Sequence, residues 1–424
     1  MAAVGVVVAA ALACVLAGWS GWAGGRSAQS QVTIRFWNGF TGPDGRTILA
    51  LVKRFNEKNP DVHVLMQRMD WGTYYNKVFV AGLGGRAPEI FVVHSAVLPR
   101  FNRAELLRPL DDLIAAGGID PSDVDANVWE YACFDGRQMA IPLDVHPLGL
   151  YYNKELLRQA GIVDGEGNPS PPANREEFVN ALRKLRKGDQ YGLIFTWLRT
   201  NAYAIMKQFG GEMFRADLSR CTLDDPANVR ALEFCVELMK EDLIARPQSM
   251  DSWIGFRQGK VGMVFEGVYM LSDLRRQGNL PYAGAPMPLL GDRAATWGDS
   301  HSLCLRRDLA GRELRAAWRF ICFLSDNSLD WADGGQVPVR KSLRDTDRFR
   351  AMSVQSQFAR QLPYVQYLPR VPFIFEFQAE FDVAVERALR LSMTPGESLA
   401  SATRRLNTIL ERDRRMYRKG GGER

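Results

Sequence analysis

The sequence lacks the short motifs by which many hydrolases, kinases and dehydrogenases are recognised. It contains no G-x-S-x-G, no H-E-x-x-H, no G-x-x-x-x-G-K-[ST] and no G-x-G-x-x-G. The glycines at Gly165 and Gly167 are followed by Pro169, which does not suit a dinucleotide-binding turn. These absences argue against the corresponding enzymes. They leave a carboxylate-based hydrolase open, because its two acids have no fixed spacing in sequence.

Long basic blocks are also missing. The formal charge of +6 comes mainly from scattered arginines, and no basic run alternates with aromatic residues. We therefore expect no nucleic-acid partner. Hydrophobic residues make up 46% of the chain and charged residues 24%, as in soluble globular proteins. The length of 424 residues predicts two domains, and residues 416–424 form a basic tail.

Cysteine is scarce and has no C-x-x-C spacing. Without Cys14 an odd number remains, so these thiols cannot all pair within the chain. We expect most of them to be small buried hydrophobes, with one disulfide left open in an oxidising compartment. The remaining five are Cys133, Cys221, Cys235, Cys304 and Cys322.

Only four histidines occur, and His94, His146 and His301 lie near the ends of predicted strands. Three imidazoles from three segments could bind zinc. However, no acidic or cysteine partner recurs at ligand spacing, and a polar sugar pocket explains the histidines equally well. The sequence therefore predicts no metal site and no cofactor.

The N-terminal segment is apolar and uncharged from Ala2 to Gly25. Small residues around Ala23 to Gly25 are typical of an export signal, although the stretch is also long enough to span a bilayer. We interpret residues 1–30 as a signal or anchor segment and predict export to the periplasm or the cell surface. Cleavage, an uncut anchor and lipidation at Cys14 all stay open.

Hydrophobic periodicity predicts two α/β units that meet just after residues 139–143. Residues 31–37, 62–66 and 90–93 are typical of strands and are separated by two helical patterns. The strand at 139–143 carries Asp144 and His146 at its tip, and the chain then enters a helix capped by Asn153 and ended at Gly161. Further strands are expected at 191–197, 261–265, 282–287 and 302–305. Polar side chains at strand ends predict a ligand crevice.

Aromatic rings and planar polar groups gather at these predicted strand ends. Sugars present apolar C–H faces that stack on aromatic rings, and hydroxyl edges that bind carboxylates, amides and imidazoles. Each residue taken alone is more often structural than functional. The candidates for faces are Trp37, Trp71, Trp197, Tyr269 and Trp297, and those for edges are Asn38, Asp144, His146, Glu266, Asp299 and His301.

Several long stretches carry a family resemblance. They are GRQMAIPLDVHPLGLYYNKELLRQAGI followed by PSPPANREEFVNALRKL, then FRQGKVGMVFEGVYM, AAWRFICFLSD and GGQVPVRKS. In these stretches, and in the order in which they occur, the chain resembles the bacterial extracellular solute-binding proteins of ABC importers. That large carbohydrate-binding family includes the maltose- and glycerol-phosphate-binding proteins.

The resemblance implies an α/β, two-lobed periplasmic-binding-protein fold (type II, Venus-flytrap) with multiple hinge crossovers. It places lobe 1 at residues 31–146 plus 289–345 and lobe 2 at residues 147–288 plus 346–415. The hinge is expected at Val145 to Gly149, with a second crossover near Ala283 to Leu289. The implied function is capture of a small carbohydrate, a mono- or oligosaccharide, between the lobes. A monomeric protein would then deliver it to the membrane permease of an ABC importer, without catalysis.

Family positions can be carried over residue by residue. Asn38, Phe40 and Thr41 match the first ligand loop, Tyr269 matches a stacking aromatic, and His146 stands where maltose binders have an acidic residue. A secreted glycan-active enzyme and a binder of a phosphorylated polyol or metal ion stay open, and Arg340 suits an anionic ligand. The predicted ligand-binding residues are Asn38, Phe40, Thr41, Trp71, His94, Asp144, His146, Trp197, Glu266, Gly267, Tyr269, Trp297, Asp299, His301 and Arg340.

Overall fold

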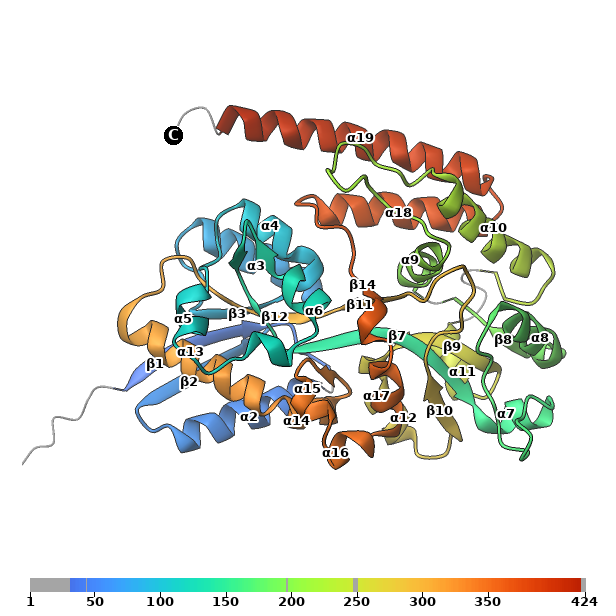
Figure 1. Cartoon of the computed structure of the whole chain (residues 1–424), viewed down its shortest axis with the longest axis horizontal. Helices are drawn as coiled ribbons and strands as arrows, with labels where there is room; N and C mark the ends of the chain where they lie inside the picture. The colour runs from blue at the N-terminus through green and yellow to red at the C-terminus, as the bar shows by residue number, and fades with distance from the viewer. Residues whose placement is uncertain (1–30, 43, 196, 247–250, 421–424) are drawn as a thin grey trace, which may run out of the picture.

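The protein contains two mixed β-sheets, each flanked by helices, in a computed structural model that describes residues 31–42, 44–195, 197–246 and 251–420 (Figure 1). The first sheet has the order β2-β1-β3-β12-β6. β1 pairs in parallel with β2 and β3, whereas β12 runs antiparallel to β3 and β6. Its strands are β1 (Val32–Asn38), β2 (Val62–Arg68), β3 (Ile90–His94), β6 (Ile141–Pro142) and β12 (His301–Leu305).

The second sheet is built around β7 (Asp144–Asn153), a ten-residue strand whose residues are all buried. The path β14-β11-β7-β9-β8 crosses it, and two further strands pair with its ends. The other strands are β8 (Tyr191–Leu193), β9 (Val261–Gly267), β10 (Tyr282–Ala285), β11 (Thr296–Asp299), β13 (Val337–Pro338) and β14 (Val365–Gln366). A separate hairpin joins β4 (Cys133–Phe134) to β5 (Arg137–Gln138).

Helices cover both sheets (Figure 1). Around the first sheet lie α2 (Asp44–Lys58), α3 (Trp71–Leu83), α4 (Leu98–Arg103), α5 (Asp111–Ala115), α6 (Ala126–Tyr131), α13 (Gly311–Asp326) and α14 (Ser328–Trp331). The second part of the molecule carries α7 (Lys154–Gln159), α8 (Arg175–Leu185), α9 (Leu198–Gln208), α10 (Pro226–Lys240), α11 (Ser252–Arg257) and α12 (Leu271–Gln277). The chain ends with α15 (Lys341–Arg344), α16 (Asp347–Arg350), α17 (Ser353–Ala359), α18 (Ile374–Leu389) and α19 (Pro395–Gly420).

Local capping signals in the sequence are confirmed. The side chain of Asn153 accepts hydrogen bonds from the backbone N–H groups of Glu155 and Leu156 at the start of α7. Gly161 follows the end of that helix with φ of 64°, a left-handed conformation that glycine adopts readily. Asn174 caps α8 by accepting from the backbone N–H of Glu177. These short-range contacts explain why the helix starts could be predicted.

The region after Leu143 differs from the prediction. Asp144 and His146 begin the long strand β7 instead of lying at the tip of a preceding one. Tyr151 and Tyr152, which directly precede the capping residue Asn153, belong to this strand and pair with β10 and β9. β7 continues over these residues because strands from distant segments pair with it along both edges. A local sequence pattern cannot predict such long-range pairing.

The crossing between the sheets also lies further along the chain than predicted. β10 pairs with β7, so the segment near Ala283 stays in the second sheet. β11 belongs to the second sheet and β12 to the first, with Ser300 alone between them. The return to the first sheet therefore takes place at Ser300.

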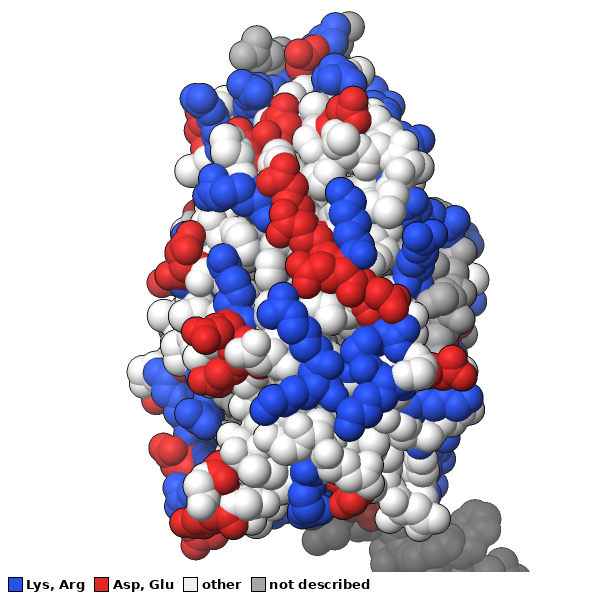
Figure 2. Space-filling view, turned by 90° about the vertical axis from the view of Figure 1, so that its right-hand side faces the viewer, with Lys and Arg blue, Asp and Glu red and all other residues white. Residues whose placement is uncertain are grey.

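The surface charge is mixed. Figure 2 shows a group of Lys and Arg side chains bordered by Asp and Glu on the face at the right of Figure 1. On α8, Arg183 pairs with Glu241, and at its end Arg186 pairs with Asp242.

The five cysteines from Cys133 to Cys322 are free thiols in this structure. Within the described residues, no helix combines the length and apolar character needed to cross a membrane. The predicted signal or anchor segment, residues 1–30, lies outside the described residues, and so does Cys14.

Candidate functional site

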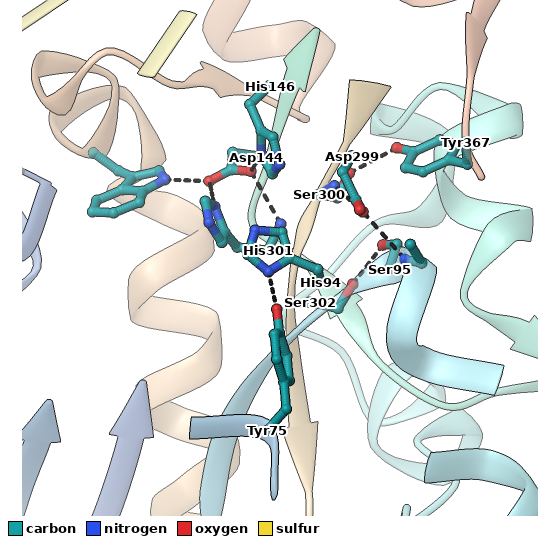
Figure 3. Close-up of polar contacts among 12 residues, drawn as sticks. Tyr75, His94, Ser95, Asp144, His146, Asp299, Ser300, His301, Ser302 and Tyr367 are labelled. Carbon is teal, nitrogen blue, oxygen red and sulfur yellow. Dashed lines mark hydrogen bonds and ion pairs between the residues drawn. The ribbon is translucent and has the colours of Figure 1, made fainter. Parts of the chain in front are cut away.

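Two pairs of strands bring most of the predicted ligand residues together. In the first sheet, His301 of β12 lies directly opposite His94 of β3. In the second, Asp299 of β11 lies opposite His146 of β7. Since Ser300 alone separates β11 from β12, both pairs meet where the sheets join (Figure 3). We call this group the inter-sheet cluster; it comprises Phe40, Trp71, His94, Asp144, His146, Tyr269, Trp297, Asp299 and His301.

Asp144 is the polar centre of the inter-sheet cluster and is fully buried. Its carboxylate accepts hydrogen bonds from Nδ1 of His301 at 2.7 Å and Nδ1 of His146 at 3.2 Å. The backbone N–H of His301 donates at 3.1 Å and Nε1 of Trp331 at 2.6 Å. Burial alone would raise the pKa of Asp144, but the adjacent His301 and these hydrogen bonds outweigh it and hold the pKa well below its usual range.

Aromatic rings enclose the histidines. The Trp71 ring centroid lies 4.5 Å from that of His94 and 5.9 Å, nearly parallel, from that of His301. Phe40 is fully buried and packs edge-on against Trp71 and His301. Phe40 therefore packs into the wall behind the histidines.

Two buried donors at the site have no hydrogen-bond partner among the described residues. They are Nδ2 of Asn38, at the end of β1, and Nε1 of Trp297, on β11. An unpaired buried donor costs about 1–3 kcal/mol, so such groups point to a partner supplied from outside the chain. By contrast, the carboxylate of Asp299 accepts hydrogen bonds from the backbone N–H groups of Ala96 and Ser300. Burial raises the pKa of Asp299 to about 6.

A second polar group lies at the end of β9. Glu266 is buried, and its carboxylate accepts from Nε1 of Trp197 at 2.8 Å and from the backbone N–H of Gly267 at 2.8 Å. Burial raises the pKa of Glu266 to about 7. A Cβ at Gly267 would lie 2.0 Å from the Tyr269 ring, so glycine is required for this close packing. Tyr269 connects the two groups, with its ring centroid 6.1 Å from that of His146.

Comparison with known proteins identifies the family. The profile of the bacterial extracellular solute-binding proteins matches residues 40–298, more than half of the chain. The chain belongs to this family. The sn-glycerol-3-phosphate-binding periplasmic protein UgpB of Escherichia coli K12 is 24% identical, over 91% of this chain and 94% of its own.

Solved structures share the fold. The sugar-binding protein MalE of Xanthomonas citri superimposes with a TM-score of 0.81 at 20% identity, over 91% of this chain and 99% of its own. The ABC substrate-binding protein Lmo0181 of Listeria monocytogenes, in complex with cycloalternan, superimposes with a TM-score of 0.78 at 19% identity. The match covers 90% of this chain and 100% of that protein. The two-lobed periplasmic-binding-protein fold predicted from the sequence is therefore confirmed.

Six predicted residues of this solute-binding protein lie outside the inter-sheet cluster: Asn38, Glu266 and Gly267, which are described above, and Thr41, Trp197 and Arg340. Thr41 is exposed, and Trp197 reaches the cluster only through Glu266. Arg340 uses its guanidinium to pair with Asp123 and Asp326. A surface cavity of about 840 Å³ lies elsewhere, and none of the predicted ligand-binding residues lines it. Its lining includes Tyr152, Pro172, Met287, Gln357, Arg360 and Tyr364.

Sequence reasoning missed two residues of the site. Trp331, in α14, donates to Asp144 and packs 4.8 Å from the Phe40 ring. Tyr75, in α3, places its hydroxyl against Nδ1 of His94. Both occupy ordinary helical positions with no flanking glycine or strand end, so the sequence carried no signal for either.

Proposed function

We propose that this solute-binding protein captures a carbohydrate between two lobes and delivers it to the membrane permease of an ABC importer. The two buried unpaired donors, Asn38 Nδ2 and Trp297 Nε1, carry the proposal because a sugar hydroxyl oxygen can accept from both. Rings at Trp71, Tyr269 and Trp297 supply apolar faces beside them. Capture of saccharides by structural relatives gives independent support.

The charge of the site favours a neutral sugar over a phosphorylated polyol. Asp144, Glu266 and Asp299 are carboxylates, and no lysine or arginine belongs to the inter-sheet cluster. A phosphate group is bound by guanidinium groups, ammonium groups or helix N-termini, and it would be repelled by the ionised Asp144. Arg340, the one basic candidate from sequence, is paired with two carboxylates.

The proposed lobes follow the sheets. Lobe 1 contains the first sheet and lobe 2 most of the second, as in the division 31–146 plus 289–345 and 147–288 plus 346–415, with the second crossing moved to Ser300. The exception is β13 (Val337–Pro338), which lies in the lobe 1 segment but pairs with the start of β7 and so connects the two lobes. Ligand contact with both lobes at once would favour the closed arrangement. Bending is expected at the start of β7, around Val145 to Gly149.

Thermal unfolding with a panel of mono- and oligosaccharides tests this function. A cognate sugar at about a hundred times its dissociation constant raises the free energy of unfolding by about 2.7 kcal/mol. sn-Glycerol 3-phosphate belongs in the panel, and stabilisation by that compound alone would overturn the neutral-sugar proposal. Saturable binding without a product excludes the glycan-active enzyme, whereas turnover of an oligosaccharide would establish it.

Replacement of Tyr269 tests the site. Tyr269→Ala removes a stacking face, so we expect sugar affinity to fall by about 2- to 12-fold, since aromatic contacts are worth about 0.5–1.5 kcal/mol beyond their buried area. Tyr269→Phe keeps the ring and should retain most of the affinity. Tyr364→Ala, in the separate 840 Å³ cavity, is the matched control. Equal affinity of Tyr269→Ala and the control would show that the sugar binds elsewhere.

A further inference from the structure

Three of the four histidines converge in the inter-sheet cluster. One ring nitrogen from each of His94, His146 and His301 lies within 4.8 Å of the other two, and the ring centroids are 4.6–5.3 Å apart. They come from β3, β7 and β12: His301 lies opposite His94, and His146 lies opposite Asp299, two residues before His301. The space between these nitrogens suits a single ion, whereas a sugar ring needs the surrounding aromatic faces.

Hydrogen bonds fix the orientation of two of these rings. A carboxylate can only accept, so Nδ1 of His146 and Nδ1 of His301 both donate to Asp144 (Figure 3). Each Nε2 then carries the free lone pair. Metal-binding histidines almost always donate their other ring N–H to a carboxylate, a backbone carbonyl or water, which sets the tautomer and raises ligand basicity.

The third imidazole is held in a similar way. The hydroxyl of Tyr75 contacts Nδ1 of His94, which leaves Nε2 of that ring for a ligand. One cation placed between the rings would accept a lone pair from the Nε2 atom of each imidazole.

We propose that His94, His146 and His301 bind one divalent transition-metal ion, for which zinc is the best match, through their Nε2 atoms. Three histidines with one open position form a known zinc arrangement, and imidazole also suits copper and nickel. Tetrahedral bonds of about 2.0–2.1 Å require nitrogens about 3.3 Å apart, so the three imidazoles would draw closer together around the ion. Asp144 supplies a buried negative charge next to the cation. This site would replace the expectation from sequence that no metal binds.

Calorimetric titration of chelator-treated protein without a polyhistidine tag tests the proposal. ZnCl₂ should bind at one ion per chain, and MgCl₂ should not bind, because magnesium prefers oxygen ligands. Cobalt(II) should add the visible absorption of a low-symmetry, nitrogen-ligated ion. Absence of stoichiometric zinc uptake by the wild type, or equal uptake of magnesium, would overturn the proposal without any variant.

Variants then assign the ligands. His146→Ala should lose the bound zinc, whereas His63→Ala, which changes the fourth histidine on β2, should keep it. Asp144→Asn should weaken zinc binding about 10–100-fold while leaving all three imidazoles in place. Circular dichroism of each metal-free variant checks folding. Retention of stoichiometric zinc by a folded His146→Ala protein would refute this ligand set. Sugar binding measured in the presence and absence of chelator keeps the metal site distinct from the proposed carbohydrate function.

Discussion

The buried carboxylate of Glu266 should make stability depend on pH in a defined window. Its pKa is about 7 in the folded protein, against 4.5 for an ordinary glutamate, because burial disfavours the ionised form. Each pKa unit is worth about 1.4 kcal/mol, so full ionisation destabilises the fold by about 3 kcal/mol. The folded state holds the proton more tightly. The stabilisation that comes from protonated Glu266 is therefore fully present below pH 4.5 and is lost as the pH rises to about 7.

Glu266→Gln removes this titration while preserving shape. Other groups also titrate across the window, so the informative quantity is the difference in unfolding free energy between variant and wild type. Urea unfolding at a series of pH values from below 4.5 to above 7 gives that difference, and we expect it to shift by about 3 kcal/mol in favour of the variant. At low pH, the remaining difference in unfolding free energy between variant and wild type reports the altered hydrogen bonds to Trp197 and Gly267.

An exposed glutamate provides the control. Glu176→Gln, at an exposed position in the first turn of α8, is measured in parallel, and the pH-dependent shift of Glu266→Gln should exceed that of Glu176→Gln. A constant difference for Glu266→Gln would refute the reasoning, because it would mean that the carboxylate is solvated as an ordinary surface group. A shift of the expected sign would show that the polar group at the end of β9 is shielded from water.

Two further substitutions test the packing of β7 and the role of Arg340. Gly149→Ala would place a Cβ 2.3 Å from the buried Phe358 ring, so we expect a loss of about 1–3 kcal/mol in urea unfolding. Gly165→Ala, with open space around it, should change little, and equal stability of the two variants would contradict the packing argument. Arg340→Ala should lower stability by about 1 kcal/mol and leave sugar affinity unchanged by calorimetry, since that guanidinium pairs with surface carboxylates. A fall in affinity would instead assign it to the ligand.

The sequence by itself determined the local structure and the family. Capping at Asn153 and Asn174 depends on neighbours two or three residues away, so the residue types suffice to predict it. Apolar periodicity located most strands for the same reason. The stretch around residues 136–162 also carried much of the resemblance to solute-binding proteins, and the family profile confirms that membership.

The tertiary structure decided which candidates meet. Asp144 and His146 were recognised as polar residues near a strand end, but their place at the start of β7 depends on partners more than a hundred residues away. The same register sets His301 opposite His94, and no sequence spacing reports it. Phe40 matched a ligand loop, yet its neighbours make it part of the core.

The physical reason is the range of the interactions. Helix caps and apolar periodicity depend on contacts within a few residues, and these are encoded in residue order. The convergence of three imidazoles, two of them hydrogen-bonded to Asp144, depends on the pairing of strands that are distant in sequence. It also depends on the helices that deliver Trp331 and Tyr75. Such contacts form only when both sheets are assembled.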